Sequence, residues 1–76
     1  MQTDMEYLEE TLRIGVAGDF IREGERTRIL RYLAEPGVSA PLVLSANMHA
    51  ARSRTSLIFF ILGLANEYWD KQAAAT

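Results

Sequence analysis

Six consecutive apolar residues, LIFFIL at positions 57–62, leave this chain few ways to fold. A helix turns by about 100° per residue, so six such positions cover its whole circumference and no single face can bury them. A helix that is apolar all round lies in the centre of a core or at an interface between copies of the chain. The run is much shorter than the roughly 20 residues of a transmembrane helix. We therefore expect a buried helix and no membrane span.

Taken alone, the same run could be a buried β-strand. No second strand-like run is present to pair with it, and the residues that follow favour helix: Ala65, Asn66, Glu67, Lys71 and Gln72. The sequence therefore predicts a long helix that begins near Ser53 or Thr55 and ends near Ala73. Gly63, in its middle, weakens the helix locally, a cost that we expect close packing against a neighbour to offset.

The composition indicates one small folded domain without a metal or disulfide framework. A chain of 76 residues is near the size at which a monomeric core is only marginally stable, and its 49% apolar and 24% charged content is that of a globular protein. It has no Cys and one His, His49, so neither a disulfide nor a thiolate or His-based metal site is expected. The first residues are acidic where a secretory signal is basic, which predicts an intracellular, cytoplasmic location.

The net charge of −2 hides an uneven distribution. Residues 1–12 carry four acids and no base, whereas the segment from Arg13 to Arg54 holds seven arginines against four acids, a balance of +3. A basic middle segment is compatible with a face that contacts phosphates. It is equally compatible with an ordinary salt-bridged surface, and both interpretations stay open.

Capping signals divide the rest of the chain into three further helices. Thr3 and Glu6 have the spacing of a capping box, which predicts a helix from Thr3 to about Ala17, followed by a looser turn to Gly24 as a possible helix C-cap. A second helix is predicted from about Glu25 to Ala34. Pro36 and Gly37 then stop it. Ser39 is predicted to cap a third helix, with Pro41 in its first turn, that ends near His49 or Ala50.

Together these signals predict an all-α fold of four helices in a single domain, residues 1–76. Residues 1–24 form its N-terminal helix and turn, and residues 25–72 form a core in which a helix, a Pro-Gly turn, a short helix and a long helix follow in the order of a helix-turn-helix. Within this core, common residue types occur in a recognisable pattern of positions. Its positions are Ile29, Leu30, Leu33, Glu35, Gly37, Ala40, Pro41, Asn47, Arg52, Ser53, Ser56, Phe59 and Leu62.

This pattern over residues 28–69 resembles the archaeal winged helix-turn-helix regulators of the phage-repressor kind. Where that family continues into a Gly-Leu-Val that opens its β-wing, this chain has Asn66-Glu67-Tyr68-Trp69. The family's recognition helix is polar or basic on its exposed side, whereas this chain has Leu57, Ile58, Phe60 and Ile61 at those positions.

The resemblance implies a small transcriptional regulator that binds double-stranded DNA. Base edges are read by hydrogen-bonding side chains, which the long helix offers only in its first turn. We therefore expect Ser53, Arg54 and Ser56 to contact DNA, while Arg52 and the backbone amides near Ser39 hold phosphates.

The long apolar helix also predicts a homodimer, because an isologous dimer is the commonest way in which a small protein covers such a surface. The residues assigned to the dimer interface are Leu8, Leu12, Leu57, Ile58, Ile61 and Trp69.

A function of another class stays open. The chain could be a non-enzymatic adaptor or inhibitor of the kind that viruses and mobile elements encode. Such a protein would bind a host protein through the apolar C-terminal helix or the acidic N-terminal helix. Catalysis is not expected, since His49 has no evident nucleophile to activate. The glycines at 15 and 18 lack the Lys-Ser/Thr ending of a phosphate loop. We predict no cofactor.

Overall fold

The computed structural model describes residues 2–75, which form four α-helices and no strand. The helices are α1 (Asp4–Ala17), α2 (Glu23–Leu33), α3 (Ala40–Ala50) and α4 (Arg54–Ala75). The predicted all-α, four-helix fold is confirmed, and the predicted helix ends lie within two residues of the observed ones.

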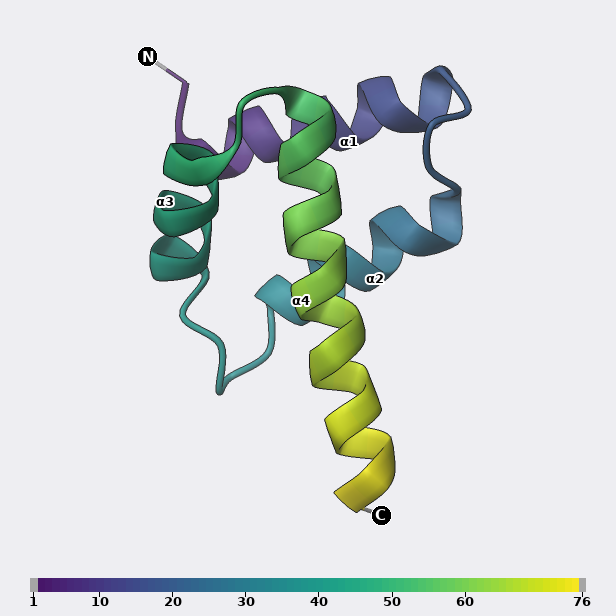
Figure 1. The fold of residues 1–76 in the computed structure, drawn as a ribbon, viewed down its shortest axis with the longest axis vertical. Helices are drawn as coiled ribbons and strands as arrows, with labels where there is room; N and C mark the ends of the chain where they lie inside the picture. The colour runs from purple at the N-terminus through teal and green to yellow at the C-terminus, as the bar shows by residue number, and fades with distance from the viewer. Residues whose placement is uncertain (1, 76) are drawn as a thin grey trace.

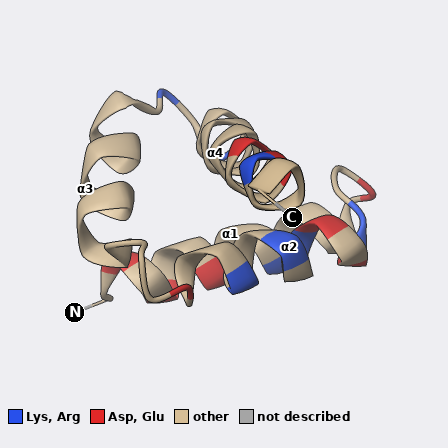
Figure 2. Ribbon diagram, turned by 90° about the horizontal axis from the view of Figure 1, so that it is seen from below, with Lys and Arg blue, Asp and Glu red and all other residues tan. Residues whose placement is uncertain are grey.

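Two layers make up the fold. In Figure 1, α1 and α2 run in opposite directions across the molecule, and α4 crosses both of them. Figure 2 shows α4 nearly end-on above the layer of α1 and α2, with α3 at one side, where it packs on both α1 and α4. The last turns of α4 extend beyond the other helices (Figure 1).

The core lies where α4 crosses the other helices. Helices α1 and α2 contribute apolar side chains at helical spacing, α3 contributes Leu44, and α4 contributes one face with an i, i+1, i+4, i+8 pattern. The buried apolar residues are Leu8, Leu12, Ile21, Ile29, Tyr32, Leu33, Leu44, Leu57, Ile58, Ile61 and Ala65.

Side-chain hydrogen bonds cap the N-termini of the two longest helices, α1 and α4. The Thr3 hydroxyl accepts from the Glu6 backbone N–H at 3.2 Å, and the Glu6 carboxylate accepts from the Thr3 N–H at 3.2 Å, which completes the capping box of α1. At the start of α4, the Ser53 Oγ accepts from the Ser56 N–H at 3.1 Å. Each bond satisfies a backbone donor that a helix terminus leaves unpaired.

The role predicted for Gly24 is wrong. Helix α2 begins at Glu23, so Gly24 lies in its first turn and not at the C-terminal end of a helix. The Arg22 N–H donates to the Glu25 carboxylate at 3.0 Å, which starts this helix. The preceding turn instead uses Asp19 at a positive φ of 59°, a conformation that Asp tolerates better than most residues.

Burial of the LIFFIL run is only partial, contrary to expectation. Leu57, Ile58 and Ile61 lie in the core, but the side chains of Phe59 and Phe60 face outward, with 55% and 44% of their surface exposed. A Cβ added at Gly63 would meet nothing within 4 Å, so no neighbour packs closely against this glycine within the chain. The outer side of α4 is therefore an apolar surface that the rest of the chain leaves uncovered.

Among the described residues, no helix combines the length and the hydropathy that crossing a membrane requires.

Candidate functional site

The turn between α3 and α4 presents polar groups around the N-terminus of α4. Arg52 and Ser53 are exposed, and the Ser53 Oγ lies 3.3 Å from the Ser56 Oγ in addition to capping the helix. The first turn of α4 contains no acidic residue, so nothing there opposes the positive end of the helix dipole. This end of α4 favours an anion.

Arg54 is held differently from its neighbours. Its guanidinium carbon lies 4.6 Å from the centre of the Tyr7 ring of α1, a cation–π geometry. A small hollow of about 160 Å³ opens beside this contact, lined by Tyr7, Arg52, Ser53, Met48, Ala51 and Leu57. Arg54 therefore joins α4 to α1, while Arg52 is the more exposed cation of the turn.

Ser39 does not join this group. It precedes α3, whose 11 residues separate it from the turn by about 16 Å at 1.5 Å per residue. Its side chain makes no capping hydrogen bond and lines another hollow, with Tyr32, Val43 and Tyr68. The structure thus brings together Arg52, Ser53, Arg54 and Ser56 from the predicted DNA-contacting set and leaves Ser39 at the opposite end of α3.

Five of the six residues assigned to a dimer interface lie inside the single chain. Leu8, Leu12 and Ile61 are fully buried, and Leu57 and Ile58 are no more than 2% exposed. They pack against the other helices of the same chain, so a second copy cannot contact them while this fold persists. Only Trp69 retains accessible surface. The assignment of these five residues to a dimer interface is therefore wrong, because the helices of one chain already cover them.

The surface that remains for a partner is the outer side of α4. Phe59 and Phe60 flank Gly63 there, and the Phe20 ring lies against that of Phe59 with ring centres 5.5 Å apart. Further along the helix this side becomes acidic at Glu67 and Asp70, both of which are exposed. Apolar patches of this kind typically mark interaction sites.

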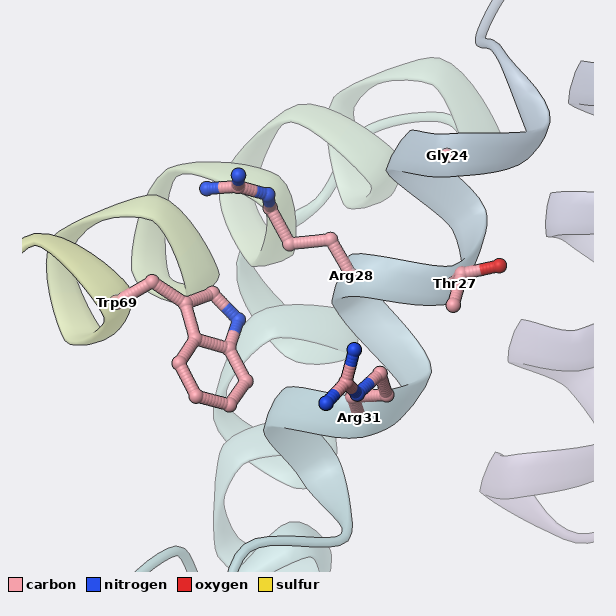
Figure 3. Close-up of a pocket in the computed structure, with 5 residues that line it drawn as sticks. All are labelled: Gly24, Thr27, Arg28, Arg31 and Trp69. Carbon is pink, nitrogen blue, oxygen red and sulfur yellow. The ribbon is translucent and has the colours of Figure 1, made fainter. Parts of the chain in front are cut away.

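A basic and aromatic hollow between α2 and α4 was not predicted from the sequence. It is an open depression of about 280 Å³, lined by Gly24, Thr27, Arg28, Arg31 and Trp69 (Figure 3). The indole of Trp69 projects from α4 towards α2, and the guanidinium groups of Arg28 and Arg31 lie around the same space, whereas Thr27 points away (Figure 3). We call it the α2–α4 hollow.

Contacts around the α2–α4 hollow fix two of its members. Arg28 Nη1 donates to the Asn66 Oδ1 of α4 at 3.1 Å. Trp69 packs edge-on against Tyr68 with ring centres 5.0 Å apart, and Tyr68 in turn lies 5.5 Å from the Tyr32 ring. These contacts orient Arg28 and the indole before any ligand arrives.

Neither arginine of the hollow is neutralised. Within residues 2–75, the ion pairs are Arg26 with Glu23 and Lys71 with Glu67, so no carboxylate lies within 4.0 Å of Arg28 or Arg31. Trp69 is 41 positions beyond Arg28 in the sequence and is brought to the hollow only by the crossing of α2 and α4. The only local indication of this hollow in the sequence was the i, i+3 spacing of Arg28 and Arg31, which places them on the same side of a helix.

Among the residues that the structure describes, no group of three or more His, Cys, Asp or Glu side chains lies close enough together to hold a metal ion.

No protein-family model, curated protein or solved structure matches this chain.

Proposed function

We propose that this protein is a small DNA-binding regulator that acts as a homodimer and has no enzymatic activity. One observation carries the proposal: Arg52 and Ser53 lie exposed at the N-terminal end of a 22-residue helix whose first turn holds no acid. A phosphate at this position would meet a cation, a hydroxyl and the positive end of a helix dipole together.

The turn supplies phosphate contacts more readily than base contacts. In the second and third turns of α4 the outer side offers Phe59, Phe60 and Gly63, none of which can hydrogen-bond to a base edge through a side chain. We therefore propose that Arg52 provides the main phosphate contact, and that Thr55 and Ser56 are the side chains nearest to a groove.

The same outer side is the surface that we propose for the dimer. Two copies of α4 that cross in antiparallel orientation at Gly63 could approach closely, because this position has no side chain. The arrangement would cover Phe59 and Phe60, the exposed aromatic side chains on this side of the helix.

This geometry also suits a DNA duplex. Ser53 lies ten residues before Gly63, so an antiparallel pair would place the two Ser53 turns about 30 Å apart at 1.5 Å per residue. Successive half-sites on one face of B-DNA are about 34 Å apart. The proposed dimer would present its two turns at nearly this spacing.

Binding of a labelled generic duplex to three proteins tests the DNA contact: the wild type, Arg52→Ala and Arg13→Ala. Arg13 is an exposed arginine on α1 and serves as the matched control. We expect micromolar binding at low salt that Arg52→Ala weakens and Arg13→Ala leaves unchanged. Equal losses in both variants, or no binding by the wild type, would reject the proposed contact.

Light scattering of the wild type and Phe60→Asp tests the dimer. Phe60 is outside the core, so the variant should keep its helical circular dichroism. A wild-type dimer and a folded Phe60→Asp monomer are expected. A wild type that stays monomeric at high micromolar concentration would reject this arrangement.

The exposed Phe59 and Phe60 also favour a second candidate function, that of an adaptor that binds another protein through the outer side of α4. It requires that this side be free in solution. A monomeric wild type without affinity for DNA would favour the adaptor over the regulator.

A further inference from the structure

We propose that the α2–α4 hollow binds a nucleoside monophosphate unit, with the base against Trp69 and the phosphate on Arg28 and Arg31. The site lies apart from the turn and from the outer side of α4, so this inference does not depend on the proposed DNA contact. Its chemistry follows from three observations: two cations without acidic partners, an oriented indole, and a space of limited size.

The two arginines define the charge of the ligand. A guanidinium group presents several N–H donors in a planar fork that matches the oxygens of a phosphate. Arg28 uses Nη1 on Asn66 and keeps its other donors, while Arg31 is exposed in the last turn of α2. Two neighbouring cations without carboxylates favour a dianion such as a phosphate monoester over a neutral ligand.

The indole defines the rest of the ligand. Trp69 is half-buried, its ring is supported by Tyr68, and it projects towards the arginines (Figure 3). Purine and pyrimidine bases stack on aromatic side chains irrespective of sequence, because every base has a π-face. An indole beside a pair of phosphate-binding arginines is therefore suited to a base that carries its own phosphate.

The acidic residues of α4 do not oppose such a ligand. Glu67 and Asp70 are displaced from Trp69 around the helix by about 200° and 100°, so they project from other sides of α4. Glu67 is also paired with Lys71 at 3.2 Å.

The hollow is small and open to solvent on one side, so one nucleotide unit is the part of a ligand that it would contact. The space of about 280 Å³ is slightly below the range of ligand pockets, which begins at roughly 300 Å³. A dinucleotide cofactor would extend well beyond it. Either a free mononucleotide or one nucleotide of a single strand presents the chemistry that the hollow requires.

Because Trp69 is the only tryptophan of the chain, its fluorescence reports on the site directly. We would titrate the wild-type protein with AMP, adenosine and inorganic phosphate, and with a short single-stranded oligodeoxyadenylate. Saturable quenching by AMP in the millimolar range or below is expected, with weaker effects of adenosine and of phosphate alone. An oligonucleotide that binds at least about tenfold tighter than AMP would identify the strand as the source of the ligand; comparable affinities would identify the free nucleotide.

Three variants establish where AMP binds. Arg31→Ala should weaken AMP binding about tenfold or more, Arg28→Lys should weaken it because the fork is lost although the charge is kept, and Arg13→Ala should bind as the wild type does. Circular dichroism of each variant checks that the helices are retained. Absence of saturable quenching in the wild type, or equal affinity of the wild type and Arg31→Ala, would overturn the proposal.

Discussion

Gly15 of α1 lies directly against Ile58 of α4. A Cβ built on the glycine would be 3.2 Å from the Ile58 Cδ1 and 3.3 Å from a side-chain carbon of Ile21. Both isoleucines are buried, so neither has open space into which it could move. The absence of a side chain at Gly15 is thus what allows α1 and α4 to pack this closely.

Gly63, in the middle of α4, and Gly15, in the last turn of α1, should respond in opposite ways to alanine. Gly63→Ala should raise the free energy of unfolding by ~1 kcal/mol through helix propensity, since its Cβ meets nothing. Gly15→Ala has at most the same propensity gain, and overpacking of ~1–3 kcal/mol should exceed it. Chemical denaturation of both variants in a Phe60→Asp background, which removes the proposed dimer, makes this comparison. Equal effects of the two substitutions would show that the contact with Ile58 is not restrictive.

An acidic residue at Leu57 should unfold the protein and not merely separate two copies. Leu57 is 1% exposed, so Leu57→Asp would bury a charge without a partner, at a cost of several kcal/mol. For a domain of this size such a loss approaches the whole stability. Circular dichroism should show loss of helix in Leu57→Asp and a native spectrum in Phe60→Asp. A folded, monomeric Leu57→Asp protein would contradict the burial described above.

Ser53 is predicted to have two separable roles. The Ser53 hydroxyl caps α4, so Ser53→Ala should lower the free energy of unfolding by ~1 kcal/mol. Ser53→Asp should keep the wild-type stability, because Asp is also a good N-cap. The negative charge of an Asp at position 53 would, however, repel a bound phosphate. Thermal melts and duplex binding should therefore diverge for Ser53→Asp, with stability kept and DNA affinity lost. Retention of both would argue against a phosphate at this turn.

Thr11 has a buried hydroxyl whose oxygen has no hydrogen-bond partner in the described chain. The residue is 1% exposed and lies among the core side chains of α1. A methyl group of similar volume needs no partner, so Thr11→Val should raise the free energy of unfolding by ~1 kcal/mol. Thr11→Ser, which keeps the hydroxyl and removes a methyl group, is the matched control and should destabilise. Destabilisation by valine would mean that the hydroxyl is satisfied in solution.

Local signals predicted the helices well because each depends on neighbours in the sequence. Thr3 with Glu6, Pro41 in the first turn of α3, and Ser53 all marked helix starts that the structure confirms. The prediction of a C-cap at Gly24 was wrong because the sequence does not distinguish a glycine in the first turn of a helix from one at a helix C-cap. The hydrogen bond to Glu25 shows that a helix starts here.

These local sequence signals could not predict the tertiary features of the fold. Hydropathy alone could not say which half of the LIFFIL run faces inward, and so Leu57 and Ile61 were assigned to a dimer interface although they fill the monomer core. The α2–α4 hollow depends on where two helices cross. Nothing local connects Arg28 and Arg31 with Trp69.

The salt dependence of DNA binding tests the regulator most directly. Each phosphate contact releases condensed counterions, so removal of one contact should lower the slope of log affinity against log salt by about 1. We predict that the wild type binds a duplex with a steep negative slope and that Arg52→Ala lowers its magnitude by about one per binding site, whereas Arg13→Ala keeps the wild-type slope. A wild-type affinity that does not change with salt, or an identical slope in Arg52→Ala, would contradict the proposal that this turn holds DNA.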